Sequence, residues 1–385
     1  MKVLQVSKFY KPVMGGIEKV AWELAEGMAR RGLRCDVLCS SHAPRTSCER
    51  FNGGYDVVRA ASYGMLLSTS MAPALAIELQ RRAASCDLLH LHMPDPMAAL
   101  ALLWARPRVP VVVHWHSDVI RQRRAMRLYQ PLQDWLLKRA DAIIATSLPY
   151  ADASLPLRRY RGKVEVIPIG ISDSLAQGDR HSDAAAALRH RFGGRRIVFA
   201  LGRMAYYKGF EVLVRAAAQL PEDAVVLIGG DGEMLATHQT LVRELGLTHK
   251  VHLCGHVQDG ELPAYFQACD VFCMSSTVRA EAYGVAMLEA MMMGKPIVAT
   301  DIPGSGVPWV NQHGITGYNV PVGRDDLLAT ALSHLLARPQ LRHAMGSAAR
   351  ARYLRGFGAD EMTQRVATLY DRLCAVCSSN LLVPT

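Results

Sequence analysis

The sequence predicts an α/β protein with two doubly wound domains, and three observations lead to this prediction. The chain has 385 residues, which is too long for one typical hydrophobic core, and half of its residues are apolar. Short apolar runs alternate with helical patterns, without an internal repeat or a low-complexity segment. The alternation restarts near residue 170. We therefore expect a first domain over residues 1–168, a second over 169–358, and a C-terminal helix and tail over 359–385.

Apolar runs predict the strands of each domain, and helical patterns such as that of residues 19–31 separate several of them. In the first domain we expect strands over residues 3–6, 35–39, 88–91, 109–114, 142–146 and 164–167. Residues 167–172 and 178–182 have the composition of a passage between domains. In the second domain we expect strands over residues 197–201, 225–229, 251–254, 271–274 and 296–299.

The segment from Gly202 to Gly209 directly follows the predicted strand at 197–201. It contains Arg203 and Lys208, so both cations should emerge at the carboxyl end of a buried strand, where open parallel sheets place their ligands. A diphosphate leaving group requires positive charge, and an Arg, a Lys and a helix amino terminus supply it without a metal ion.

A second segment carries Glu281 and Glu289, with Tyr283 and Gly284 between them, and leads into a helix that Gly294 ends. The backbone N–H groups at the start of such a helix can bind an anion. Carboxylates accept hydrogen bonds from vicinal hydroxyls, so one glutamate can bind a hexose while the other binds a ribose. Together, the two segments predict a pocket for a sugar nucleotide.

With these motifs the chain resembles glycosyltransferase family 4, and its segment from His114 to Gln122 is more narrowly similar to the bacterial O-antigen and capsule mannosyltransferases. Glu281 and Glu289 match the family pattern Glu-x7-Glu, and Arg203 and Lys208 match Gly-Arg-x4-Lys-Gly. Two further motifs match in the first domain, the loop glycines Gly15 and Gly16 and the histidine of the strand at 109–114 and its end, His116. Four motifs in the right order make the resemblance specific, and it covers nearly the whole chain.

The resemblance implies the GT-B fold, in which two Rossmann-like lobes face each other across a cleft and the final helix returns to the first lobe. It implies that His116, Arg203, Lys208 and Glu281 take part in catalysis, and that no metal or other cofactor is required. The residues that it places near the donor are Gly15, Gly16, Gly202, Arg203, Lys208, Gly230, His256, Val257, Glu281, Tyr283, Gly284, Val285 and Glu289.

As implied by the family, we expect a retaining hexosyltransferase that uses a nucleotide-diphosphate sugar, with GDP-mannose favoured over a UDP-hexose. The acceptor would be an oligosaccharide or a lipid-linked sugar of bacterial surface polysaccharide synthesis. Two departures from the family pattern affect the donor details, Ile169 in place of an asparagine and the run Val278-Arg279-Ala280 before Glu281. Two other functions stay open, a sugar-nucleotide 2-epimerase and a sugar-nucleotide binding protein without catalysis.

The positive charge lies in the first domain, where residues 1–168 hold 24 Lys and Arg against 14 Asp and Glu. Much of it is concentrated around Arg121, Arg123 and Arg124, with apolar residues nearby, which suits an anionic membrane surface. A solvated helix face is the alternative, and nucleic acid is not expected because no binding module accompanies the charge. We expect a cytoplasmic protein, peripheral on the inner face of the cell membrane, since the start of the chain does not resemble a signal peptide and no apolar run reaches about 20 residues.

His90 and His92, like His114 and His116, form His-x-His pairs whose side chains point the same way on a strand. This spacing suits two metal ligands, but no third histidine or carboxylate at a clear spacing completes a site, so no metal is expected. The histidines could also be polar wall residues, whereas the family match assigns His116 to the donor sugar or the reaction centre. Asp118 is a candidate for a hydrogen bond to sugar or acceptor, or for a helix cap.

Overall fold

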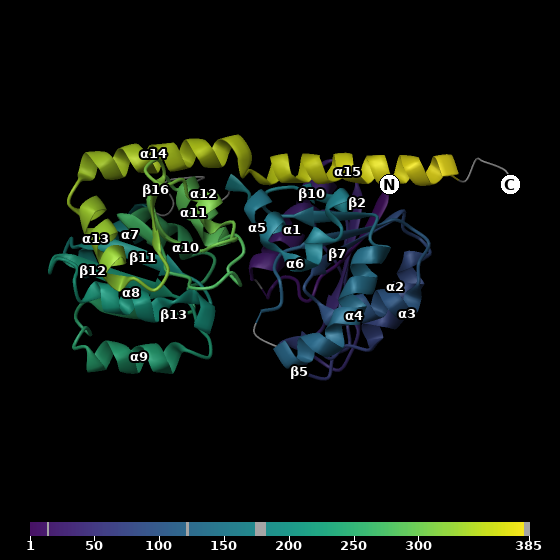
Figure 1. The fold of residues 1–385 in the computed structure, drawn as a ribbon, viewed down its shortest axis with the longest axis horizontal. Helices are drawn as coiled ribbons and strands as arrows, with labels where there is room; N and C mark the ends of the chain where they lie inside the picture. Colours follow the sequence, from purple (N-terminus) through teal and green to yellow (C-terminus); the bar gives the residue numbers. More distant parts are fainter. Residues whose placement is uncertain (14, 121–122, 174–181, 381–385) are drawn as a thin grey trace. The chain divides into compact units, whose positions relative to one another are not determined.

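The computed structural model describes residues 1–385 except 14, 121–122, 174–181 and 381–385 (Figure 1). The chain divides into two compact units, which we call the N-terminal lobe (Met1–Gly170 with Ala359–Thr385) and the C-terminal lobe (Ile171–Gly358). Of the segments expected to link the domains, residues 178–181 lie outside the described part of the chain. Among the described residues, no helix has the length and apolar character needed to cross a membrane.

The N-terminal lobe is built on a sheet with the strand order β10-β9-β8-β7-β1-β2-β4-β3, in which all pairs are parallel except β3 with β4. The chain winds outward from β1 in both directions, so the point where the winding reverses lies between β1 and β7. The strands are β1 (Lys2–Val6), β2 (Arg34–Ser40), β3 (Ser47–Arg50), β4 (Asp56–Ala60), β7 (Leu88–Met93), β8 (Val111–Trp115), β9 (Ala142–Ala145) and β10 (Val164–Val166), and β5 (Met65–Leu66) forms a separate hairpin with β6 (Thr69–Ser70).

Helices cover this sheet, and the last helix of the chain packs on the first. A Cβ atom on Gly27 of α1 would lie 2.3 Å from Thr363 Oγ1 of α15, so only glycine permits this close approach of the two helices. The helices of the lobe are α1 (Gly16–Arg30), α2 (Ala74–Ala83), α3 (Pro96–Ala105), α4 (Arg123–Arg139), α5 (Leu148–Ala153), α6 (Leu155–Arg158), the short 3₁₀ helix η1 (Arg161–Lys163) and α15 (Ala359–Asn380).

The C-terminal lobe has an all-parallel sheet with the order β13-β12-β11-β14-β15-β16, and its winding reverses between β11 and β14. The strands are β11 (Arg196–Leu201), β12 (Ala224–Gly229), β13 (Val251–Gly255), β14 (Val271–Met274), β15 (Ile297–Asp301) and β16 (Gly317–Pro321). The helices are α7 (Ser182–Arg191), η4 (Tyr206–Lys208), α8 (Phe210–Ala217), α9 (Leu235–Glu244), α10 (Leu262–Ala268), α11 (Val285–Met292), α12 (Val307–Val310), α13 (Asp325–Leu336) and α14 (Pro339–Gly356).

Successive residues of β11 face opposite layers of helices, which explains why its sequence is apolar throughout. Val198 and Ala200 belong to a core cluster that includes residues of α8 and α13. Phe199, between them, packs against Phe266 of α10, with ring centroids 5.2 Å apart. A strand that is buried on both faces carries no polar alternation. This is the pattern that allowed β11 to be identified from sequence.

The strands β3, β4, β5, β6 and β16 were not predicted, because their sequences lack that pattern. All four residues of β3 are exposed, and β4 and β16 mix apolar residues with charged residues, glycine or proline. The other strands agree with the expected ranges to within a few residues. The predicted strand at 109–114 begins at Val111, since Pro110 lacks the N–H group that a ladder requires.

Candidate functional site

The two sequence motifs of the C-terminal lobe occupy neighbouring loops at the carboxyl edge of the sheet. Arg203 and Lys208 follow β11, and Glu281 follows β14, the strand that pairs with β11 on the side where the winding reverses. Such a reversal leaves a crevice outside the strand ends, because the connections leave in opposite directions. The fold therefore brings together two segments that lie far apart in the sequence.

Lys208 and Glu281 form a largely buried ion pair. Lys208 Nζ lies 2.5 Å from Glu281 Oε2, and the two side chains are only 12% and 10% exposed. Burial opposes the charge of Lys208, but the Glu281 carboxylate nearby and its hydrogen bond outweigh it, so that the pKa of Lys208 is raised. The ammonium group is therefore charged at neutral pH.

Three serines support this pair, and the sequence analysis did not single them out. Ser276 Oγ donates to Glu281 Oε2 at 3.0 Å, and Ser305 Oγ donates to the Glu281 carbonyl. Ser275 Oγ donates to the carbonyl of Lys208 at 3.1 Å. The available signal was the Ser-Ser-Thr run directly after the apolar strand β14, since small hydroxyl residues at a carboxyl edge commonly bind neighbouring polar groups.

Glycines let the loops of this edge approach one another at backbone contact distance. A Cβ atom on Gly230 would lie 1.9 Å from the carbonyl oxygen of Gly202, and Gly230 has a φ of +133°. Gly202 N donates to the Gly229 carbonyl at 3.0 Å, and a Cβ on Gly202 would meet the Lys208 side chain. Only glycine fits at position 230, whereas the Lys208 side chain would have to move to admit a Cβ at position 202. The resulting surface offers backbone groups rather than side chains to a ligand.

The second carboxylate lies on α11, the helix that begins after Gly284. Gly284 has a φ of +84° and caps the helix, so that Val285 is its first residue. Glu289 lies on α11 between apolar neighbours and is only 5% exposed. Tyr283 is 3% exposed, and its ring packs against those of Trp309 and Phe357. The Tyr283 ring thus forms part of an aromatic core and leaves its backbone to the loop.

The remaining predicted donor residues lie on the adjoining loops of the same lobe. Arg203 and His256 are exposed, whereas Val257 is buried and its Cγ2 packs close to Gly229. Gly230 N donates to the Gly255 carbonyl at 2.6 Å, which ties the loop after β12 to the loop before His256. The structure thus gathers ten predicted residues at one edge of the C-terminal lobe: Gly202, Arg203, Lys208, Gly230, His256, Val257, Glu281, Gly284, Val285 and Glu289.

In the N-terminal lobe, Gly15 and Gly16 lie at the start of α1. Gly15 is the N-cap, with an extended φ of −138°, and Gly16 is the first helical residue. They do not follow the first strand directly, because β1 ends at Val6. Lys19 N donates to the Gly15 carbonyl at 2.9 Å. A Cβ atom added at position 15 would lie 2.5 Å from Glu18 Oε2. Both glycines are exposed at a helix N-terminus, a position that suits an anion.

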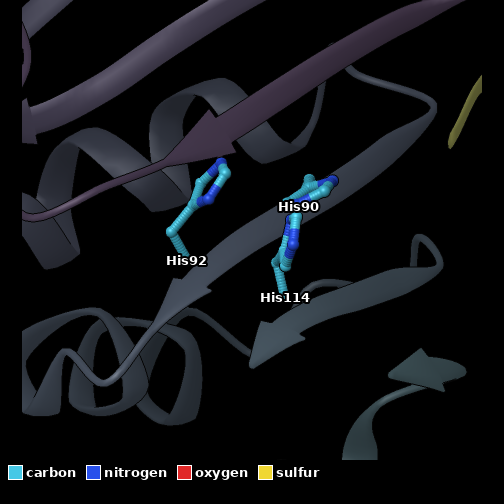
Figure 2. A group of neighbouring side chains, drawn as sticks. All are labelled: His90, His92 and His114. Atoms are coloured by element: carbon cyan, nitrogen blue, oxygen red, sulfur yellow. Dashed lines mark hydrogen bonds between the residues drawn. The ribbon is translucent and has the colours of Figure 1, made fainter. Parts of the chain in front are cut away.

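His116 belongs to a cluster of four buried histidines on two neighbouring strands. His90 and His92 lie on β7, and His114 lies on β8 opposite His92 (Figure 2), while His116 follows β8 directly. His92 Nδ1 and His116 Nε2 are 2.9 Å apart, and His90 Nε2 and His114 Nδ1 are 3.3 Å apart. Burial lowers the pKa of His116 to about 3. This imidazole is neutral at physiological pH, so it acts as a hydrogen-bonding group rather than as a cation.

One sequence interpretation in this region requires correction. We expected no third histidine to accompany the His-x-His pairs, but the parallel register places the two pairs side by side, and His90, His92 and His114 have ligand atoms within 4.8 Å of one another. Asp118 Oδ1 accepts from Trp115 Nε1 and Ser154 Oγ, both at 2.8 Å.

Comparisons with known proteins cover both lobes. Residues 188–352 match the family model described as "Glycosyl transferases group 1", and residues 14–175 match that described as "Glycosyltransferase Family 4". The chain is 32% identical to O-antigen chain mannosyltransferase C of Escherichia coli, over 97% of this chain and 99% of the relative. It is 35% identical to D-rhamnosyltransferase WbpZ of Pseudomonas aeruginosa, over 93% of each chain.

Solved structures with the same fold are more distant in sequence. Sucrose-phosphate synthase from Thermosynechococcus elongatus has a TM-score of 0.84 at 22% identity, over 97% of this chain and 99% of that one. HepE of Anabaena, in complex with UDP and glucose, has a TM-score of 0.78 at 22% identity, over 97% and 100%. These likenesses confirm that each lobe is Rossmann-like and that the fold is GT-B.

Proposed function

Since the chain belongs to family 4 of the glycosyltransferases and acts as a glycosyltransferase of surface polysaccharide synthesis, we propose that it transfers a manno-configured hexose from a GDP-sugar to a glycan acceptor, with retention of configuration. The membership confirms the resemblance drawn from the motifs. The 2-epimerase and the binding protein without catalysis are not favoured by these relatives.

The observation that carries the donor site is the ion pair of Lys208 and Glu281 at the edge between β11 and β14. A buried ion pair is costly unless each charge has further partners, and this one lies where a parallel sheet binds its ligand. A sugar nucleotide offers both an anionic diphosphate for the ammonium group and hydroxyl donors for the carboxylate. Its binding would therefore satisfy the two charges at once.

Each residue of this edge has a distinct role in the proposal. Lys208, the exposed Arg203 and the amino terminus of α11 would stabilise the charge that develops on the departing diphosphate. Glu281 and Glu289 would accept hydrogen bonds from hydroxyls of the hexose and the ribose. Because three positive groups are available, the transfer would need no divalent cation at the diphosphate. In the N-terminal lobe, Gly15 and Gly16 would bind an anionic group through backbone N–H groups, and His116 would hydrogen-bond to the donor sugar.

The preference for GDP-mannose or a close derivative rests on the relatives. O-antigen chain mannosyltransferase C is named for mannose and WbpZ for D-rhamnose, which is 6-deoxymannose. A pocket built for this stereochemistry would recognise the axial 2-hydroxyl that both sugars share. The exposed His256 and the loop after β13 would contact the base.

We further propose that the acceptor is an oligosaccharide or a lipid-linked sugar at the inner face of the membrane. The basic excess of the first 168 residues and the amphipathic α4 support this location. Leu128 on α4 is 87% exposed, beside the exposed Arg127. An exposed leucine next to cations suits the interface of an anionic bilayer. Arg121 lies outside the described residues.

The test is a donor screen with purified protein and EDTA, using GDP-mannose, GDP-D-rhamnose, UDP-glucose and UDP-N-acetylglucosamine. We expect a GDP-sugar to raise the melting temperature and to be slowly hydrolysed, and the Lys208→Met variant to lose both responses. Transfer to a synthetic mannoside, followed by NMR of the new anomeric centre, would report retention. A response to UDP-sugars alone would refute the base assignment, isomerisation of the donor without an acceptor would indicate the epimerase, and binding without turnover of any donor would indicate a binding protein.

A further inference from the structure

The histidine cluster of the N-terminal lobe is more fully buried than a hydrogen-bonding role in catalysis requires. His90 and His114 are 0% exposed and His92 is 1% exposed, and the rings of His90, His92 and His114 stack or tilt against one another with centroids 4.6–5.4 Å apart. Burial of an imidazole in an apolar sheet costs free energy unless both ring nitrogens have partners. The partners of each nitrogen therefore decide what the cluster can do.

One ring nitrogen of His92 carries a lone pair that points toward the cluster. Gln5 Nε2 donates to Cys35 Sγ at 2.9 Å, so Gln5 Oε1 is the acceptor of its bond with His92 Nε2, at 2.7 Å. His92 is thus protonated on Nε2, and its Nδ1 carries the lone pair. An imidazole whose distal N–H is held by an amide oxygen has the arrangement that metal-binding histidines usually show.

His90 is held in the same way from the other side. Its Nδ1 lies 2.5 Å from the hydroxyl of Tyr370 on α15, which leaves Nε2 to face His114 Nδ1. When His90 donates a hydrogen bond from Nδ1 to the tyrosine oxygen, its Nε2 carries a lone pair as well. His90 Nδ1 and His92 Nε2 therefore each have a partner that can accept a hydrogen bond. The other nitrogen of each ring faces the cluster.

The ring of His114 leaves one nitrogen without a hydrogen-bond partner among the described residues. This nitrogen is Nε2, and it is buried. His114 can therefore hold its proton on Nε2 without breaking a hydrogen bond, which leaves a lone pair on Nδ1, the nitrogen that faces His90. A buried polar nitrogen without a partner indicates that the described residues do not complete this network.

The spacing of the nitrogens suits a tetrahedral zinc ion. With Zn–N bonds of about 2.0–2.1 Å, two nitrogens of a tetrahedral site lie about 3.3 Å apart. His90 Nε2 and His114 Nδ1 lie 3.3 Å apart, longer than an ordinary N–H···N hydrogen bond, and ligand atoms of all three histidines lie within 4.8 Å.

We propose that His90, His92 and His114 bind a zinc ion in the core of the N-terminal lobe, with water in the fourth position, and that this ion links β7 to β8. His92 Nδ1 would exchange its hydrogen bond with His116 Nε2 for the metal, so that binding of the ion releases His116. The site lies outside the donor edge of the C-terminal lobe, and its existence does not depend on the proposed transfer reaction.

The test measures metal content and cobalt spectra rather than activity. The protein is unfolded in denaturant with EDTA, desalted, and refolded with a small excess of Zn²⁺ or Co²⁺, because a fully buried site fills most readily during folding. After desalting we expect about one zinc ion per chain, and with Co²⁺ the intense visible bands of a four-coordinate N-ligated ion. Mg²⁺, which prefers oxygen ligands, should not be retained.

Matched variants separate this site from adventitious binding by surface histidines. His114→Gln and His92→Gln should each lower the retained zinc at least about tenfold, as loss of one ligand does. His249→Gln, which changes a histidine that is 59% exposed, should retain the ion, and so should His116→Ala. If His114→Gln fails to refold, the cobalt spectrum and the zinc content of the unchanged protein decide. Zinc well below one per chain in that protein, or equal zinc in folded His114→Gln, would overturn the proposal.

Discussion

Lys208 Nζ and Glu281 Oε2 lie 2.5 Å apart although 73 residues separate them in the sequence. The proximity follows from the sheet order, since β11 and β14 are neighbours and each releases its loop at the same edge. The pair is therefore fixed by the topology of the C-terminal lobe before any ligand binds. A preformed pair of opposite charges costs little reorganisation when a diphosphate and a sugar replace part of each interaction.

The first prediction concerns activity at this pair. Lys208→Met and Glu281→Gln should each lower the rate of sugar transfer at least about 100-fold, because each removes a group that we propose to bind the donor in the transition state. Initial rates with a saturating acceptor would measure the effect. Glu244→Gln, which changes an exposed glutamate at the last residue of α9, should keep the activity within about twofold, since surface substitutions away from a site are nearly neutral. Full activity in either pair variant would remove the pair from the site.

Stability separates the roles of the two charges. Lys208→Met leaves the Glu281 carboxylate buried without its cation and should lower the free energy of unfolding by about 3 kcal/mol. Adding Glu281→Gln removes the remaining charge, while the Gln amide can still bond to Ser276. The double variant should therefore regain part of the stability but none of the activity. Urea titrations of the three variants test this, and equal stability of the single and double variants would contradict it.

The second prediction concerns the close backbone contact at Gly230. Gly230→Ala places a Cβ atom 1.9 Å from the Gly202 carbonyl at a φ of +133°, so we expect the free energy of unfolding to fall by at least about 2 kcal/mol and donor affinity to be lost. Gly255→Ala is the matched control, because it has a φ of +67° but nothing within 4 Å of the added Cβ. It should cost only about 1 kcal/mol. Melting temperatures of the two variants with and without donor would show the difference.

Much of the fold could be predicted because both sheets are parallel and buried. Strands such as β11 and β12 are apolar runs bounded by turns, and glycines mark the turns that follow them. The edge strands β3 and β16 lack this signal, since exposed strands require no apolar pattern. Sequence alone gave no means of finding the pairing of β4 between β2 and β3, which depends on long-range contacts.

The candidate site divides in the same way. Motif spacing identified Arg203, Lys208, Glu281 and Glu289, because their residue types follow recognisable strands or begin a helix. The supporting serines and the histidine cluster depend on which strands lie side by side. His92 and His114 are opposite each other only through the register of β7 with β8, and that register cannot be derived from the spacing within either pair.

The third prediction concerns pH. Burial lowers the pKa values of His90, His92, His114 and His116, so the unfolded state binds protons near pH 6.5 while the folded state does not. Stability is therefore complete well above pH 6.5 and falls as the pH approaches and passes this value, with a slope approaching 1.4 kcal/mol per pH unit for each histidine. Asp95, whose pKa burial raises to about 6, opposes this trend because its folded form takes up a proton first.

Urea titrations in EDTA at pH 7.5, 6.5 and 5.5 test the pH prediction. The free energy of unfolding should drop between the first two values and more steeply between the last two. His90→Gln should reduce the slope, whereas substitution of the exposed His249 should leave it unchanged. A free energy that stays constant from pH 7.5 to 5.5 would show that the buried histidines take up protons in the folded state as readily as in the unfolded chain.

The last prediction tests the membrane surface. Replacing Arg121, Arg123 and Arg124 with Gln should weaken sedimentation with phosphatidylglycerol vesicles at low salt at least about tenfold, since each cation near an anionic bilayer contributes about 1 kcal/mol. Replacing the exposed Arg243, Arg338 and Arg355 of the C-terminal lobe removes the same charge and should change binding little. Leu128→Glu should weaken binding even at high salt, where charge is screened, because it removes an exposed apolar side chain from the interface. Equal binding by the two triple variants would return the basic segment to a solvated helix face, because net charge alone would then account for the attraction.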